Sequence, residues 1–90
     1  MKIDVYDSYA QSSKGHLIHF DVLVEESVSK EKAFEYGQSW LKKIGEIPEN
    51  LDQSRCNYCH TEQASPEVLN HIKEDGYYIL QMEGCPDPIN

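Results

Sequence analysis

Residues 1–26, MKIDVYDSYAQSSKGHLIHFDVLVEE, decide the fold because they predict a β-hairpin. Residues 1–9 alternate in polarity, and residues 16–24 are rich in β-branched and aromatic side chains, as is typical of strands. The sequence AQSSKG between these two stretches has the composition of a turn. We therefore expect two antiparallel strands at the start of the chain.

A turn centred on Ser13 and Lys14 predicts the register of this hairpin. Asp7 then lies opposite Phe20, on a face that is otherwise apolar and suited to the core. The other face is predicted to be polar and open, with Tyr6, Ser8, His19 and Asp21. Asp7 conflicts with this arrangement, because it places a carboxylate on the face that is predicted to form the core. Such conflicts tend to mark functional or strained sites.

The remaining chain predicts two helices and two strands. The first helix is expected over residues 29–45, with Ser29 as N-cap and Gly45 at its end. The second is expected over residues 65–76, with Pro66 at its first position. Strands are expected over residues 55–63 and 77–83.

The order ββαβαβ predicts an α+β fold with two layers and one domain over residues 1–90. Each strand–helix–strand unit would be a right-handed crossover between parallel strands. We therefore expect a mixed four-stranded sheet with both helices on one face.

Composition limits the classes of partner. The chain has 16 acidic and 8 basic side chains, a formal charge of −8 and a single arginine, so nucleic acids and anionic membranes are unfavourable partners. The charged, alternating start predicts no export signal, and we expect a cytoplasmic protein. Its three cysteines are then expected to be reduced thiols.

RCNYCHTEQ, residues 55–63, holds a Cys-x-x-Cys-His pattern. Haem attachment is excluded by the predicted location and by the strand-rich composition. Zinc is the alternative that stays open, with Cys56, Cys59, His60 and Cys85 as a Cys₃His set. Against zinc, no glycine provides a tight turn, and strand alternation places the first two cysteines on opposite faces.

Nucleophilic chemistry is less favoured. Alternation puts Cys56, Tyr58, His60 and Glu62 on one strand face, so Cys59 is predicted to point away from the adjacent imidazole. We expect the cysteines to be small, buried apolar residues. Ser8, His19 and Asp21 would share a face, but without a nucleophile turn or an oxyanion hole they indicate a polar surface.

Four blocks of the sequence, VYDSY, GHLIHFDVLV, CNYCHTEQASPEV and GYYILQMEGC, resemble a family of short bacterial proteins known only as a domain of unknown function. The resemblance implies a compact single domain with this order of elements, and it implies no activity. It also suggests where a site would be sought: Asp7, Tyr9, His19, Asp21, Cys56, Cys59, His60 and Glu62.

These observations favour a non-enzymatic interaction or ligand-binding domain without a cofactor, and the zinc protein is the alternative. A thiol-dependent enzyme is the least favoured reading. The candidate ligand-binding residues are Asp7, Tyr9, His19, Asp21, His60 and Glu62. If the polar face is instead the seam of a homodimer, Tyr6, Leu17 and Leu23 would contribute to it.

Overall fold

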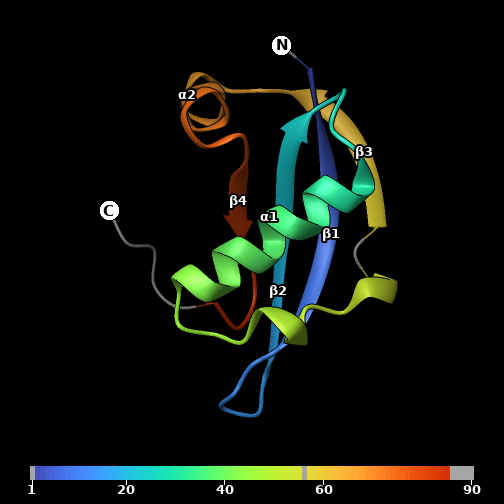
Figure 1. The fold of residues 1–90 in the computed structure, drawn as a ribbon. Coiled ribbons are helices and arrows are strands. Elements are labelled where there is room, and N and C mark those ends of the chain that lie inside the picture. Colours follow the sequence, from blue (N-terminus) through green and yellow to red (C-terminus); the bar gives the residue numbers. More distant parts are fainter. Residues whose placement is uncertain (1, 56, 86–90) are drawn as a thin grey trace.

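A computed structural model describes residues 2–55 and 57–85 of the chain. The strands are β1 (Lys2–Gln11), β2 (Leu17–Glu25), β3 (Asn57–Gln63) and β4 (Tyr78–Gln81), and the helices are α1 (Lys30–Lys43) and α2 (Pro66–Asp75). Two short 3₁₀ turns, η1 (Pro48–Asn50) and η2 (Gln53–Arg55), connect α1 to β3. This confirms the α+β class and the predicted order of elements (Figure 1).

The sheet has the strand order β3-β1-β2-β4, and each of its pairings is antiparallel. The prediction of a mixed sheet with parallel neighbours was therefore wrong. β3 does run in the direction of β2, as a crossover requires, but β1 lies between them. α2 lies across one end of the sheet, so the chain turns back there and β4 runs against β2 (Figure 1).

The hairpin register differs by one residue from the prediction. Asp7 lies opposite Asp21, where the sequence had suggested Phe20. The cause is the loop: Ser12 N–H donates to the carbonyl of His16 over 2.7 Å, which leaves three residues between them. The last of these is Gly15, whose φ of 92° gives the left-handed position that a three-residue hairpin loop needs.

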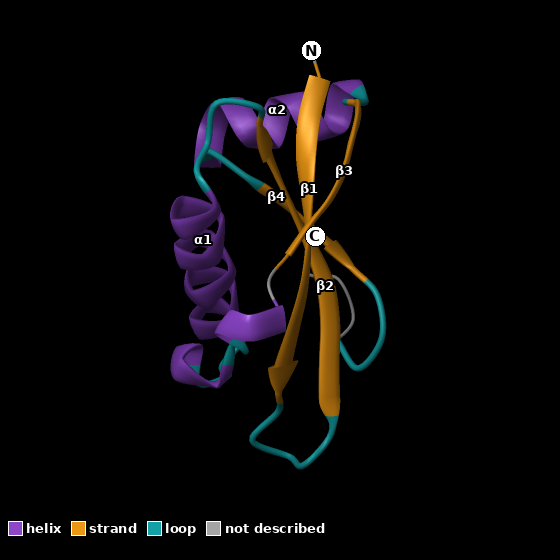
Figure 2. Cartoon of the chain, turned by 90° about the vertical axis from the view of Figure 1, so that its right-hand side faces the viewer, coloured by secondary structure: helices purple, strands orange, loops and turns teal. Residues whose placement is uncertain are grey.

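This register places the two helices on opposite faces of the sheet, which corrects the prediction of a shared face. Even-numbered side chains of the hairpin, such as Phe20 and Val22, pack with Trp40 and Leu41 of α1. Odd-numbered side chains pack with α2 in a second cluster of Ile3, Val5, Leu23, Ala64 and Ile72. Viewed along the edge of the sheet, α1 lies on one side and α2 crosses the end (Figure 2).

The helix ends agree with the sequence prediction. The Ser29 side chain accepts a hydrogen bond from the backbone of Lys32, and Ser65 does the same for Val68. Gly76 ends α2 in the left-handed conformation. Each cap satisfies a backbone group that the helix terminus would otherwise leave without a partner.

Candidate functional site

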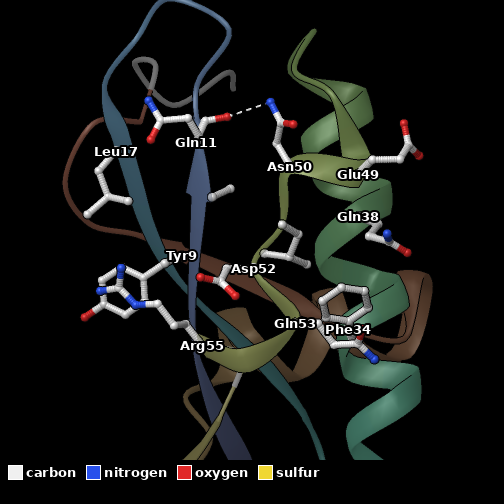
Figure 3. Close-up of a pocket in the computed structure, with 12 residues that line it drawn as sticks. Tyr9, Gln11, Leu17, Phe34, Gln38, Glu49, Asn50, Asp52, Gln53 and Arg55 are labelled. Carbon is white, nitrogen blue, oxygen red and sulfur yellow. Dashed lines mark hydrogen bonds between the residues drawn. The ribbon is translucent and has the colours of Figure 1, made fainter.

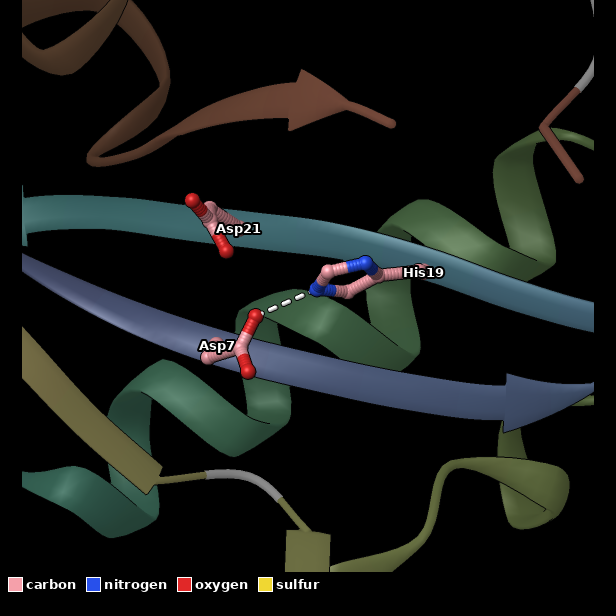
Figure 4. A group of neighbouring side chains, drawn as sticks. All are labelled: Asp7, His19 and Asp21. Carbon is pink, nitrogen blue, oxygen red and sulfur yellow. Dashed lines mark hydrogen bonds and ion pairs between the residues drawn. The ribbon is translucent and has the colours of Figure 1, made fainter. Parts of the chain in front are cut away.

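The actual register gathers Asp7, His19 and Asp21 on one face of the hairpin. Asp7 and Asp21 are directly opposite each other on β1 and β2, and His19 comes two residues before Asp21. The three side chains converge, and their nearest ligand atoms all lie within 4.8 Å of one another (Figure 4). His19 Nε2 and Asp7 Oδ1 form a hydrogen-bonded ion pair. We call these three residues the acid–imidazole cluster.

The cluster is open to solvent on one side and closed at its base. Asp21 is 6% exposed, whereas the side chains of Asp7 and His19 are 35% and 22% exposed. Among the described residues, no group donates a hydrogen bond to Asp21 Oδ1. A buried carboxylate oxygen without a donor is costly, because burial removes water and provides nothing in its place.

The two carboxylates titrate in opposite directions. Burial, together with the hydrogen bond and negative charge of Asp7, raises the pKa of Asp21 to about 6. Burial also acts to raise the pKa of Asp7, but hydrogen bonds from His19 and Asp21 and the charge of the imidazole outweigh it, and the pKa is lowered. This divergence is typical of paired carboxylates that share one proton.

Tyr9, Met82 and Glu83 hold His19 in place. The Tyr9 and His19 rings are stacked, with 4.3 Å between their centroids and 5° between their planes. The backbone of His19 exchanges hydrogen bonds with Met82 and Glu83, which extend the pairing beyond β4. The imidazole is therefore oriented by a ring on its face and by a fixed backbone on either side of β2.

β3 adds His60 and Glu62 to the same face, as predicted from alternation. His60 lies opposite Val5 and Glu62 opposite Ile3. When protonated, His60 acts to lower the pKa of Asp21, an effect smaller than those of burial, Asp7 and His19. The six candidate ligand-binding residues of the sequence thus share one sheet face.

The predicted strand is confirmed over Asn57–Gln63, but the predicted positions of Tyr58 and Cys59 were wrong because the strand is irregular. The register shifts between Val5 and Tyr6, so that Tyr58 pairs with Tyr6 and Cys59 is skipped. Tyr58 consequently moves to the other face, where its hydroxyl bonds to Thr61 over 2.7 Å. Cys59 is exposed, contrary to the expected buried position.

The cysteines with His60 do not form the predicted zinc set among the described residues. Cys85 packs against the α1 face and donates to the carbonyl of His19, whereas His60 lies on the opposite face of β3. Two strand spacings of roughly 4.8 Å separate β3 from β2, so one ion cannot bind both His60 on β3 and Cys85 beside β2. Cys56 lies outside the described residues, and so does the prediction that it opposes Cys59.

Two predicted surfaces are also corrected. Ser8 is fully buried on the α1 face and cannot join His19 and Asp21 in a polar set. Tyr6 and Leu23 are 7% and 4% exposed, so they cannot form the seam suggested for a homodimer. The first error follows from the one-residue difference in register, and the second also from the packing of α2 against Leu23.

Sequence reasoning missed a cavity of about 580 Å³ between α1, the end of β1 and the 3₁₀ turns (Figure 3). The guanidinium of Arg55 lies over the Tyr9 ring at 4.0 Å from its centroid, a cation–π contact. Asn50 donates to the backbone carbonyl of Gln11 over 3.0 Å and fixes the turns against β1. The sequence signal for this cavity is Arg55, the only arginine of the chain.

The fold and the cluster define a small α+β domain that gathers carboxylates and imidazoles on one half of a sheet face. The chain belongs to the family described as "Domain of unknown function (DUF2024)", which it matches over residues 1–82. It is similar to the NMR structure of protein NE1680 from Nitrosomonas europaea, with 42% sequence identity and a TM-score of 0.82. That match covers 96% of this chain and 100% of the other.

The neighbour comes from a bacterium, in agreement with the resemblance noted from the sequence. No curated protein matches the chain. Within residues 2–55 and 57–85, neither helix has the length and apolar character needed to cross a membrane.

Proposed function

We propose that this protein is a binding domain for a divalent cation, held by Asp7, His19 and Asp21. One observation carries the proposal: the buried Asp21 Oδ1 has no donor among the described residues, beside a second carboxylate and an imidazole. Ionised carboxylates this close repel each other in a partly buried site. A cation between them would replace repulsion with coordination.

The distances allow such an ion. First-row divalent ions hold nitrogen and oxygen ligands at about 2.0–2.2 Å, so ligands on opposite sides of the ion are at most about 4.4 Å apart. The cluster atoms lie within 4.8 Å, so an ion requires a contraction of a few tenths of an ångström across the cluster. It also requires His19 Nε2 and Asp7 Oδ1 to exchange their direct hydrogen bond for bonds to the ion and to move apart. The imidazole favours zinc over magnesium and calcium, which prefer oxygen ligands throughout, and the two carboxylates also suit manganese.

Three protein ligands leave further coordination positions for water or a small anion. The exposed side of the cluster, next to Asp7, is where such a molecule would enter. The proposal assigns binding and no reaction. We also propose a cytoplasmic location, and the charge of −8 argues against nucleic-acid partners.

Calorimetric titration of the full chain with Zn²⁺ and with Mn²⁺, after treatment with chelator, tests the proposal. We expect one ion per chain, and Asp21→Asn should weaken binding by more than about tenfold, the least that loss of a supporting group costs. His71→Gln and Asp75→Asn are matched controls, because that exposed pair lies apart from the cluster on α2. Absence of binding at millimolar metal, or unchanged affinity in Asp21→Asn, would overturn the proposal.

Cobalt spectroscopy separates this site from the cysteine alternative. Co²⁺ at the cluster has only oxygen and nitrogen ligands, so we expect no sulfur-to-cobalt charge-transfer band. A charge-transfer band that disappears in Cys59→Ser would show that the ion binds the thiols and would contradict the assignment.

A further inference from the structure

The irregularity in β3 brings a thiol and an imidazole together. On a regular strand, Cys59 and His60 would point to opposite faces. Because the register skips Cys59 between Tyr58 and His60, the strand is bulged, and bulges re-aim side chains. Cys59 Sγ consequently lies 3.3 Å from His60 Nδ1, within hydrogen-bond distance for sulfur.

Glu62 completes the arrangement on the other side of the ring. Its Oε1 lies 3.6 Å from His60 Nε2. A carboxylate beside Nε2 favours the tautomer that carries its proton there, which leaves the lone pair of Nδ1 directed at the thiol. A nucleophile, a base and a group that orients the base therefore follow one another along four residues of β3.

We propose that Cys59 is a reactive thiol and a site of covalent modification by small soft electrophiles. His60 takes the thiol proton, and the sulfur attacks the electrophilic atom. With iodoacetamide as probe, a carbon–sulfur bond forms, the carbon–iodine bond breaks, and iodide leaves with the bonding electrons. This site is separate from the cation cluster, and it uses neither Asp7 nor His19.

Exposure supports the assignment. Cys59 is exposed at the edge of the sheet, and the side chains of His60 and Glu62 are 52% and 46% exposed. A reagent can therefore reach the sulfur without any movement of the fold. No other described strand or helix pairs with the outer edge of β3, which ends the strand order.

Cys85 provides an internal comparison. It is partly buried and donates to the carbonyl of His19 over 3.4 Å. Burial raises the pKa of its thiol, with a partial offset from a hydrogen bond donated by the backbone of Met82. The fold therefore keeps one cysteine protonated and places another beside a base.

Site-resolved alkylation by iodoacetamide tests the proposal, with chelator present and Cys56 replaced by Ser throughout. At pH 7 we expect Cys59 to react about threefold or more faster than in a synthetic peptide of residues 55–63, because the folded strand holds His60 Nδ1 within reach of the sulfur, where it can accept the thiol proton. Cys85 should react more slowly than Cys59. His60→Gln should bring Cys59 to the peptide rate and move its pH–rate midpoint upward.

Glu62→Gln should give a smaller decrease in the same direction, and it keeps the test valid if His60→Gln unfolds. His71→Gln is the matched control, because its imidazole lies on α2, and it should leave the rate unchanged. Equal rates for Cys59 in the folded chain and the peptide would overturn the proposal. So would a pH–rate profile that neither His60→Gln nor Glu62→Gln moves.

Discussion

Two halves of the same sheet face differ in what covers them. At one end, Ile3, Val5 and Leu23 lie under α2, and all three are at most 4% exposed. At the other end, the same two strands present the acid–imidazole cluster, and neither of the described helices covers it. α2 has ten residues, a length of about 15 Å, which covers only part of a hairpin face. Alternation along the strands therefore decides which face a side chain takes, and the length of α2 decides whether that part of the face is buried core or an exposed site.

The largest effect should come from the covered half. Ile72→Ala on α2 removes a side chain that is 4% exposed and packed on Ile3 and Val5. We expect the free energy of unfolding to fall by about 2–4 kcal/mol, from lost transfer and a new cavity. Urea denaturation measures it, and cation affinity at the cluster should not change. A loss below about 0.5 kcal/mol, typical of surface positions, would show that α2 does not close this half.

In the open half, we expect binding of a cation to change the free energy of unfolding by a similar amount. Zn²⁺ at 100 times its dissociation constant should raise the free energy of unfolding by about 2.7 kcal/mol, because it binds only the folded cluster. Thermal melts with and without chelator measure the shift. Asp7→Asn should remove most of it and Asp75→Asn should not. An equal shift in both variants would mean that the ion binds elsewhere.

The sequence predicted what depends on local signals. Ser29, Ser65 and Gly76 act through contacts within one turn of their helices, and each lies where it was expected. The hairpin also depends on local signals, but its register depends on the centre of the loop. The prediction centred the loop between Ser13 and Lys14, whereas the actual loop is centred on Lys14. Both centres lie in the same turn-like composition, so alternation alone could not choose between them.

The candidate site was predicted as a set of residues and only partly as a geometry. Asp7 drew notice as a conflict in the core, and the conflict disappears because the true register puts it beside His19 and Asp21. The Cys59–His60 contact could not be predicted, since a bulge at an edge strand leaves no composition signal in CNYCH.

Weakening the start of α2 should affect the covered half alone. Ser65→Ala removes the side chain that accepts from Val68 N–H at 3.3 Å. We expect a loss of about 1 kcal/mol in the free energy of unfolding. Calorimetric titration should give the wild-type affinity for zinc, because the cluster receives no contact from the cap. A weaker affinity would show that the two halves are coupled through α2.

The smallest effect, and the one with a distinctive sign, concerns Asp21 in metal-free protein. Its pKa is raised to about 6 in the folded chain, chiefly by burial, from an ordinary value of 3.8. The folded state therefore holds the proton more tightly than the unfolded state. Stability from this group is fully present below pH 3.8 and is lost as the pH rises through 6.

Asp21→Asn mimics the protonated carboxyl at every pH, so its advantage over the wild type should be pH-dependent. We expect a gain of about 1 kcal/mol at pH 7.5, since nearby water screens part of the repulsion with Asp7. The gain should vanish as the pH falls below 3.8, because the wild type is then protonated in both the folded and the unfolded state. Urea denaturation in chelator across this range measures it, with Asp75→Asn as the exposed control. A gain that is constant with pH would point to packing, and a loss at pH 7.5 would show that the ionised Asp21 is satisfied without a cation.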